Sequence, residues 1–363
     1  MWRGALLLGA LAAVALIAAG CGGGGVDDGT LSDEEIAEKV EEINRTAPSV
    51  GLGEGAPPLP SDTEWATDLT KHSVPLDEIT SGGPPKDGIP ALDAPTFETA
   101  LDVDWLAKRE PVIAVTVEGL TRGYPIQVLM WHEIVNDELQ GRPIAVTFCP
   151  LCNTSIVFDR RLDGTVLDFG TTGKLRNSDL VMYDRQTESW WQQFSGEAIV
   201  GELTGSRLDQ IAARIVSWQE FRTTYPESEV LSRETGYARD YGRNPYRGYD
   251  DVDSPPFFGT DNDDDRRLAP KERVVYLEVG DDAIAVPFAV FTKTPTLTTK
   301  VGGVTAAVRW RADVASALDA GEIGAGRNVG AVTVTIDGKP VPFHEPFWFA
   351  VAAFRPDVRI VRE

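Results

Sequence analysis

The chain has 363 residues and a formal net charge of −22 at pH 7, because 56 acidic residues outnumber 34 basic ones. So acidic a surface excludes binding to nucleic acid, which depends on a basic stripe that neutralises phosphates. The length is ample for a sizeable core, and with only three cysteines that core, rather than a framework of disulfides, must hold the fold.

The first twenty residues predict a lipoprotein signal peptide. One positive charge, Arg3, precedes the apolar run 5–19, which is too short to span a bilayer comfortably and ends in small residues. The sequence Ala19-Gly20-Cys21 resembles the bacterial lipobox. By that resemblance Cys21 is diacylated and anchors the exported protein to the outer face of the bacterial cell membrane, or to its periplasmic side. The alternative is an ordinary signal peptide followed by a chance cysteine.

Residues 21–62 predict a flexible tether rich in glycine and proline. Within it, residues 31–44 favour a short acidic helix, with Ser32 as N-cap and Glu35 placed for a capping box. A β-rich globular domain is expected over residues 63–363. No later run is long and apolar enough to cross a membrane.

From residue 110 the pattern is mainly that of strands. Residues 112–117 and 144–148 are both rich in β-branched or apolar side chains, and the second run ends at Cys149. Between them, residues 126–139 predict a helix, because apolar side chains recur there at helical spacing. Gly141 is a natural stop for that helix.

After the second of the two neighbouring cysteines the sequence favours hairpins. Asp163-Gly164 is a typical two-residue turn between β-rich runs. Residues 180–183 and 190–194 flank a polar turn and predict another hairpin. The expected fold class is therefore mainly β (α+β): a β-rich single domain of hairpins with a few short helices.

A weak internal repeat appears at an offset of about 162 residues. Tyr124-Pro125 falls on Val286-Pro287, and the matching segments would be residues 110–232 and 272–363. The irregular stretch 236–270 between them predicts either a functional lid or disorder. The alternative to a duplication is that two β-meanders share apolar spacing.

The run Cys149-Pro-Leu-Cys152 is the most informative motif of the chain. Two thiols three positions apart can exchange a disulfide, hold a soft metal ion or close a structural clip. If the repeat is a duplication, the thiols belong to the first copy alone, because Arg311 and Val314 occupy the matching positions in the second.

Thiol–disulfide exchange requires a thiolate that a helix N-terminus or a nearby cation stabilises. Thioredoxin-like enzymes supply that helix directly after the motif. Here residues 156–158 are β-branched and aromatic, which favours a strand. This counts against a thioredoxin fold, although not against all redox chemistry.

Metal binding is the second interpretation, because the motif resembles one knuckle of a zinc ribbon. A closed site needs further ligands, and the histidines of the chain are His72, His132 and His344. His132 is the best candidate, since its predicted helix directly precedes the strand that carries Cys149. Two thiolates and one imidazole suit copper(I), and two chains sharing one zinc ion is an alternative. The competing interpretation of His132 is a satisfied core histidine.

The third interpretation is a disulfide clip. A disulfide that closes so short a loop would stabilise the folded state by about 2 kcal/mol, from the loop-closure entropy that the unfolded chain loses. Such a bridge would form in an oxidising compartment whether or not it had a function.

Two weaker candidates complete the set. A cluster near Trp190 and Trp191 has the residue types that an acid–base pocket with an aromatic wall requires; its members are Asp179, Tyr183, Asp184, Arg185 and Glu188. The alternative is a hairpin whose tryptophans fill the core. The loop 82–88, which contains Lys86 and Asp87, has a composition that exposes backbone and is expected at the same working surface as the thiols.

Several longer motifs stand out: residues 81–93 (Ser-Gly-Gly-Pro-Pro-Lys-Asp-Gly-Ile-Pro-Ala-Leu-Asp), 131–137 (Trp-His-Glu-Ile-Val-Asn-Asp), the cysteine run, 177–187 (Asn-Ser-Asp-Leu-Val-Met-Tyr-Asp-Arg-Gln-Thr) and 347–350 (Phe-Trp-Phe-Ala). Together they resemble the bacterial domain-of-unknown-function family 3179, over roughly residues 70–363. The resemblance implies an exported or membrane-anchored β-rich domain and brings no activity, cofactor or catalytic residue. Val351 and Arg355 stand where that family leads us to expect a bulky aromatic and a histidine, which argues against a metal site at the C-terminus.

We therefore expect a cell-envelope lipoprotein that acts as a binding or metal-handling module through Cys149 and Cys152, with copper or zinc as the metal. The alternatives are an extracytoplasmic thiol–disulfide oxidoreductase and a structural module with a disulfide clip. A helix at residues 153–165 would favour the oxidoreductase. A tight hairpin there, with His132 near the sulfurs, would favour metal binding.

Overall fold

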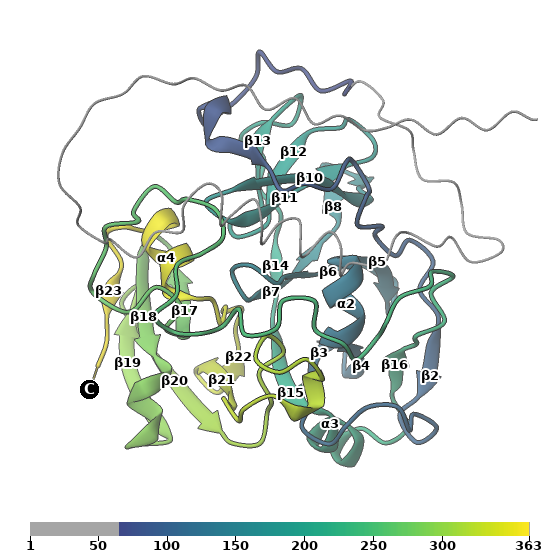
Figure 1. Ribbon diagram of the computed structural model, residues 1–363, viewed down its shortest axis with the longest axis vertical. Coiled ribbons are helices and arrows are strands. Elements are labelled where there is room, and N and C mark those ends of the chain that lie inside the picture. Colours follow the sequence, from purple (N-terminus) through teal and green to yellow (C-terminus); the bar gives the residue numbers. More distant parts are fainter. Residues whose placement is uncertain (1–64, 363) are drawn as a thin grey trace, which may run out of the picture. The chain divides into compact units, whose positions relative to one another are not determined.

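A computed structural model describes residues 65–362, all of which belong to one compact unit. The predicted signal peptide, Cys21 and the acidic helix of residues 31–44 lie outside the described residues. The described part is mainly β, which confirms the predicted fold class. Its five larger sheets are small and mostly antiparallel, and they are arranged as a propeller-like ring of five blades (Figure 1). Within residues 65–362, no helix has the length and apolar character needed to cross a membrane.

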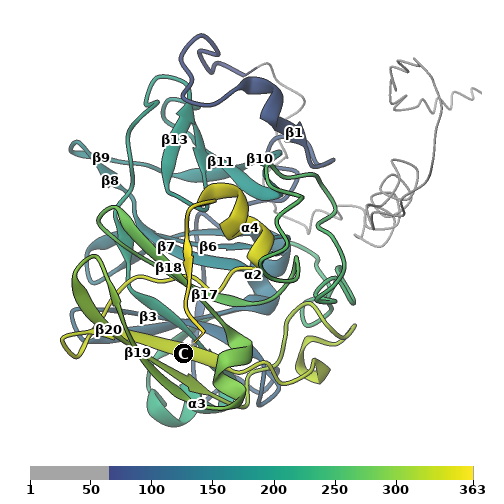
Figure 2. The ribbon, with the colours of Figure 1, turned by 90° about the vertical axis from the view of Figure 1, so that its left-hand side faces the viewer.

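Two of the sheets carry the residues discussed below. One has the order β1-β10-β11-β12-β13, with bounds Ile79–Ser81, Phe169–Arg176, Asp179–Asp184, Trp190–Gln192 and Glu197–Val200. The other has the order β14-β7-β6-β5, with bounds Gln210–Ile211, Thr154–Asp159, Arg142–Cys149 and Ile134–Leu139. In both views β6 and β7 run through the middle of the described part (Figure 1, Figure 2).

Three further sheets complete the ring. The sheet β15-β3-β4-β16-β2 has bounds Ala213–Ser217, Pro111–Val117, Leu120–Pro125, Glu229–Leu231 and Phe97–Thr99; β17-β18-β23 has Val274–Val279, Asp282–Pro287 and Arg359–Ile360; β19-β20-β21-β22 has Thr296–Val301, Val304–Arg311, Ala331–Ile336 and Lys339–Pro340. A small hairpin joins β8 (Arg161–Leu162) to β9 (Thr165–Val166) across the predicted Asp163-Gly164 turn.

The helices of residues 65–362 are short. The α-helices there are α2 (Ile126–His132), α3 (Trp218–Thr224) and α4 (Trp348–Phe354), and the 3-10 helices are η1 (Leu76–Glu78), η2 (Phe288–Thr292) and η3 (Ile323–Ala325). Ser217 caps α3 by accepting a hydrogen bond from the backbone N–H of Glu220, which satisfies a donor that the first turn leaves free.

The predicted helix over residues 126–139 is wrong in its second half. The helix α2 ends at His132 because Glu133 adopts a positive φ of 57°, which closes the last turn. The β-branched residues Ile134 and Val135 then begin β5, which pairs antiparallel with β6. The apolar side chains at helical spacing are therefore shared between a buried helix and a buried strand, which short apolar patterns do not distinguish.

The order of elements in the first half of the domain recurs in the second. The strands β3, β4, β5 and β6 have counterparts of nearly equal length in β17, β18, β19 and β20. In each half a strand that follows a late helix (β16 after α3, β23 after α4) pairs in parallel with the second strand of the series. The recurrence concerns the order of elements alone, and the duplication stays a prediction.

Large aromatic side chains fill the core where the two site-bearing sheets face each other. Phe148, Phe158, Phe169 and Trp191 are all almost fully buried, and the last two meet edge to face with ring centroids 5.8 Å apart. Burial of rings of this size is a leading source of stability in such a core.

The stretch 236–270 contains no helix or strand. The turn between β10 and β11 holds its far end: the Ser178 hydroxyl donates to the Phe258 carbonyl over 2.6 Å, and the Asn177 amide donates to the Asp261 carboxylate over 2.9 Å. The stretch is therefore tied to the strand β11.

Candidate metal centre

A tight hairpin positions the two cysteines. Cys149 is the last residue of β6 and pairs with Thr154, the first residue of β7, so that Cys152 lies in the connection between them. Asn153 adopts a positive φ of 57°, which asparagine tolerates, and its amide donates to the Glu345 carbonyl over 2.7 Å. The predicted strand after the motif is thus confirmed, and the described residues have no helix at 153–165.

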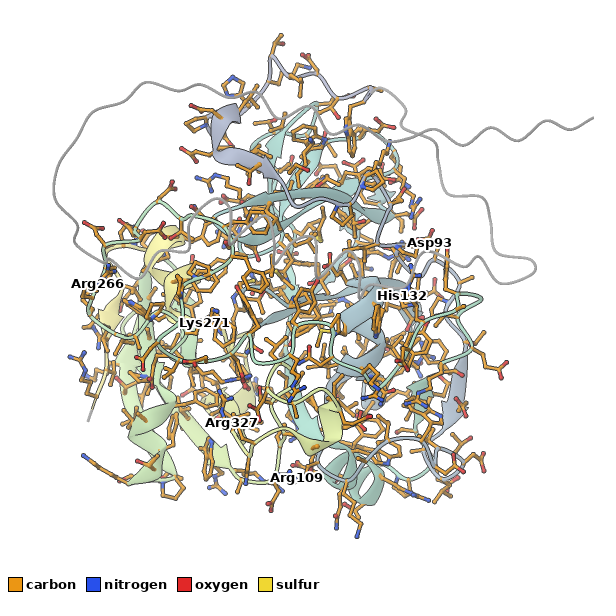
Figure 3. All side chains as sticks on the ribbon, viewed as in Figure 1. Asp93, Arg109, His132, Arg266, Lys271 and Arg327 are labelled. Carbon is orange, nitrogen blue, oxygen red and sulfur yellow. The ribbon has the colours of Figure 1, made fainter. Side chains whose placement is uncertain are left out.

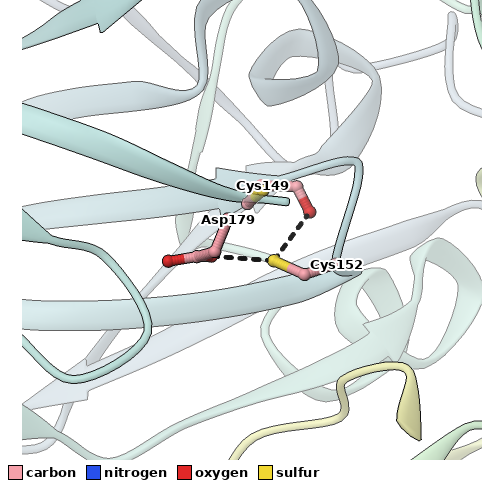
Figure 4. A group of neighbouring side chains, drawn as sticks. All are labelled: Cys149, Cys152 and Asp179. Carbon is pink, nitrogen blue, oxygen red and sulfur yellow. Dashed lines mark hydrogen bonds between the residues drawn. The ribbon is translucent and has the colours of Figure 1, made fainter. Parts of the chain in front are cut away.

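A carboxylate from the neighbouring sheet meets the thiols. Asp179 begins β11, and its side chain points toward Cys152 (Figure 4). The two sulfur atoms and a carboxylate oxygen of Asp179 all lie within 4.8 Å of one another, and all three residues are buried. The thiol of Cys152 donates to Asp179 Oδ1 over 2.8 Å. Ligand atoms around one tetrahedral zinc ion would lie roughly 3.5–3.8 Å apart, so little movement separates this arrangement from a chelate.

Hydrogen bonds orient the carboxylate. Asp179 Oδ2 accepts from Gln192 Nε2 over 2.6 Å and from the backbone N–H of Phe194 over 2.9 Å. The other carboxylate oxygen of Asp179, Oδ1, faces the thiol of Cys152. On the other side of Cys152, its Sγ lies 2.8 Å from the Thr154 hydroxyl, which donates to Gln193 Oε1 over 2.7 Å. Partners of this kind hold metal ligands in position.

The acidic groups around the two cysteines hold their protons more strongly than they would in water, so a cation that replaces those protons would be stabilised there. Burial raises the pKa of Asp179 to about 6, and burial together with Asp179 raises the pKa of Glu133 to about 8. Burial also raises the pKa of both thiols, and Asp179 adds to the effect on each. Asp179 therefore opposes the ionisation of Glu133 and of both thiols, and at neutral pH the thiols are protonated.

Tyr249 completes the surroundings. Its hydroxyl is buried, and burial raises its pKa most. Cys149 and Cys152 raise the pKa further, so this hydroxyl lies in the field of the thiols.

Several segments that the sequence assigned to a working surface converge on one apolar pocket. About 610 Å³ of space not filled by atoms lies in the pocket and in front of it, and this figure includes open solvent. Its wall includes Gly82 and Pro84 of the loop 82–88, Glu133 after α2, Leu151 between the cysteines, and Tyr246 of the stretch 236–270. Glu133 belongs both to this wall and to the charged surroundings of Cys149.

His132 is not part of the group of possible ligands. It lies on α2 (Figure 3), where Nδ1 donates to the Pro90 carbonyl over 2.7 Å and Nε2 lies 2.6 Å from the Tyr241 hydroxyl. Burial lowers its pKa to about 4, so the ring is neutral and Nε2 accepts from Tyr241. This arrangement agrees with the alternative of a satisfied core histidine. His344, bonded to Gln210, and the exposed His72 also lie outside the group.

Of the residues expected in the acid–base pocket and the loop 82–88, Lys86, Asp87 and Arg185 lie together around Tyr183, whereas Asp184 lies apart. Lys86 pairs with Glu188 at 2.6 Å and lies over the rings of Trp65 and Tyr183. Asp87 accepts from the Tyr183 hydroxyl, and Arg185 lies 3.6 Å from Asp87 and 3.0 Å from Asp93.

Asp184 faces the other side of its strand. It accepts from the backbone N–H of Thr187 over 2.6 Å and from the indole of Trp191 over 2.9 Å. Asp184 therefore holds a turn and a core tryptophan, whereas Asp179, which the sequence placed in the same cluster, lies at the thiols. The local signal for Asp179 is its position directly after the turn residues Asn177 and Ser178.

Comparison with known proteins gives one match. The family described as "Protein of unknown function (DUF3179)" matches residues 86–358, which is most of the chain. No curated protein and no solved structure matches it.

Proposed function

The chain belongs to the DUF3179 family, and we propose that it is an exported, lipid-anchored protein that binds one zinc ion through Cys149, Cys152 and Asp179. The observation that carries this proposal is the meeting of two buried thiols and one buried carboxylate, from two different sheets, within 4.8 Å. Three protein ligands with a water molecule or substrate in the fourth position are the usual coordination of a catalytic zinc ion.

The donor set favours zinc over copper(I). A carboxylate oxygen is a hard ligand, and copper(I) prefers thiolate, thioether and imidazole. His132, the imidazole that would have favoured copper, has both ring nitrogens engaged elsewhere. Zinc is borderline in softness and accepts two sulfurs with an oxygen.

The protonation of the site supports metal binding over thiol–disulfide exchange. Exchange requires an accessible thiolate of lowered pKa. Both thiols here are buried and their pKa values are raised. A zinc ion supplies the positive charge that makes two thiolates and a carboxylate compatible in one buried site, and its binding releases protons.

Metal analysis of the full chain, purified anaerobically without chelator, tests the proposal. We expect close to one zinc ion per chain, lost in Cys149→Ser and retained in Asp184→Asn, which changes a buried carboxylate outside the group. Metal-free protein whose two thiols react only after reduction would instead indicate a disulfide clip. Metal-free protein with a thiol pKa well below the usual value of about 8.5 would indicate an exchange catalyst.

Lipid anchoring rests on the sequence Ala19-Gly20-Cys21. We expect a globomycin-sensitive mobility shift in the host, absent in Cys21→Ser. If the native chain were processed without sensitivity to globomycin, an ordinary signal peptide would replace the anchor.

A further inference from the structure

The apolar pocket beside the thiols has one carboxyl group in its wall. Most of the wall is hydrocarbon or aromatic, including Ile89, Leu151, Leu175, Leu180 and Phe258. Of the lining residues that the structure describes, Glu133 alone is acidic. Pockets of this kind, mostly apolar with a few polar groups, are typical of sites for small organic molecules.

The carboxyl group of Glu133 has no partner among the described residues. The residue is 8% exposed, and within residues 65–362 no hydrogen-bond donor or basic group contacts its side-chain oxygens. Two other polar side chains of the wall have partners: the Thr171 hydroxyl donates to the Ile89 carbonyl over 2.7 Å, and Lys174 Nζ lies 5.3 Å from the Trp190 ring centroid. The ionised form of a buried carboxyl group without a donor is costly, and the pKa of Glu133 is accordingly raised to about 8. A cationic hydrogen-bond donor on the occupant would stabilise the ionised form, which makes such an occupant complementary to Glu133.

The aromatic side chains of the wall favour a positive charge on that occupant. Tyr246, Phe257 and Phe258 all belong to the stretch that the turn at Asn177 and Ser178 ties down over the pocket. The face of an aromatic ring attracts an organic cation, more strongly where water is excluded. A carboxylate at one end and rings along the side together suit an ammonium group attached to a hydrocarbon body.

We propose that this pocket binds a small amphipathic amine, whose ammonium group pairs with Glu133 while its compact aromatic or alkyl body packs against the apolar wall. The proposal is separate from the zinc site. Glu133 is not one of the three proposed ligands, and the apolar wall is built mainly by other segments.

Isothermal titration calorimetry on the full chain tests the proposal with three probes that share one ring. The probes are 2-phenylethylamine, the neutral 2-phenylethanol and the anionic 3-phenylpropionate. We expect the amine to bind at least ten-fold more tightly than the alcohol and the acid to bind most weakly. Equal affinities, a preference for the acid, or no binding of the amine would overturn the proposal.

Two variants test whether Glu133 is the charge that gives the preference for the amine over the alcohol. Glu133→Gln keeps the size of the side chain and should reduce the preference for amine over alcohol to less than two-fold. Glu138→Gln, the same change at an exposed position of β5, should leave the preference intact. If Glu133→Gln fails to fold, the comparison of the three probes on the native chain still shows whether the pocket prefers an amine.

Repeating the titration on Cys149→Ser separates this inference from the zinc proposal. Retention of the amine preference in that variant supports a pocket that works without metal. Loss of the preference in a folded Cys149→Ser chain would overturn an independent amine site, whatever the metal analysis shows.

Discussion

Asp179 and Asp184 stand at the two ends of one strand, β11, and neither is measurably exposed. They differ in what they face: Asp179 meets the thiol of Cys152, and Asp184 meets a backbone N–H and the indole of Trp191. The pair therefore offers a matched comparison between a proposed metal ligand and a structural carboxylate.

We predict that Asp179→Asn lowers zinc affinity by at least 100-fold, because the amide oxygen carries no charge and loss of even an orienting partner costs about 10–100-fold at metal sites. Asp184→Asn should change zinc affinity by less than three-fold. Competition with a zinc-binding dye measures both. Equal losses in the two variants would mean that Asp179 acts only through the stability of the fold.

Glu133 gives the zinc-free protein a pH-dependent stability. Its pKa is about 8 in the folded chain, against about 4.3 in an unfolded one. Between these values the folded state holds a proton that the unfolded state has lost, so the free energy of unfolding falls as the pH rises.

We predict that Glu133→Gln removes this decline. Relative to the native chain, the zinc-free variant should gain on the order of 1 kcal/mol of stability per pH unit between pH 5 and pH 8. Urea unfolding at pH 5, 6.5 and 8 measures the difference. For the control Glu138→Gln, the free energy of unfolding should differ from that of the native chain by the same amount at all three pH values. If the Glu133→Gln difference were also the same at all three, Glu133 would not be the source of the pH dependence.

At the scale of elements, the strand β10 is shaped to admit the loop 82–88. Its register against β11 shifts between Thr171 and Lys174, which is a bulge, and Gly173 within it has a φ of +70°. The backbone N–H of Gly82 donates to the Gly173 carbonyl over 2.8 Å. A side chain on Gly173 would begin 1.9 Å from the Pro84 carbonyl oxygen, so only glycine allows this approach.

We predict that Gly173→Ala destabilises the fold by about 1–3 kcal/mol more than Gly119→Ala does, because the overpacked loop must move. Gly119 also has a positive φ, of +85°, but open space around it, so its replacement costs about 1–2 kcal/mol from backbone strain alone. Thermal unfolding of both variants gives the comparison. Equal losses would show that the loop is not held against β10.

The helix α2 ends in a residue that links it to the stretch 236–270. The ring of His132 bridges the Pro90 carbonyl and the Tyr241 hydroxyl. We predict that His132→Phe lowers the free energy of unfolding by about 1–3 kcal/mol, since the Pro90 carbonyl and the Tyr241 hydroxyl each lose a partner. Zinc stoichiometry, measured on the same samples, should stay unchanged. Loss of zinc from a folded His132→Phe chain would restore His132 as a ligand.

The turns and strands that were predicted correctly are those whose own residues specify them. The Asp163-Gly164 turn, the strand after Cys152 and the hairpin of β11 and β12 all follow from the residues within them. The predicted helix failed past His132 because one backbone angle, at Glu133, divides a continuous apolar pattern. Composition does not encode that angle, since glutamate is not a typical residue for it.

At the scale of the whole molecule, the candidate site depends on contacts that the sequence pattern does not display. Asp179 reaches Cys152 from another sheet, 27 positions along the chain. The pocket likewise forms only when the stretch 236–270 is held against β11. The sequence identified the thiols, the loop 82–88 and the irregular stretch as candidates, but which carboxylate completes the group depends on how the blades face one another.

The two halves of the domain share an order of strands, but only the first half carries the proposed zinc ligands. The positions that match Cys149 and Cys152 in the second half are Arg311, which is exposed at the end of β20, and Val314, which is buried. Neither can bind zinc. In the proposed account the first half carries the metal while the second half supports it, for example through the Glu345 carbonyl that holds Asn153.

X-ray absorption spectroscopy at the zinc edge, on the full chain with one equivalent of zinc, tests the central claim most directly. The proposed ligands predict two sulfur scatterers at about 2.3 Å and oxygen scatterers at about 2.0–2.2 Å, and the loss of this sulfur shell in Cys149→Ser, which does not retain the zinc. A spectrum of oxygen and nitrogen scatterers alone, or one unchanged by Cys149→Ser, would contradict a zinc site built on the two thiols and Asp179.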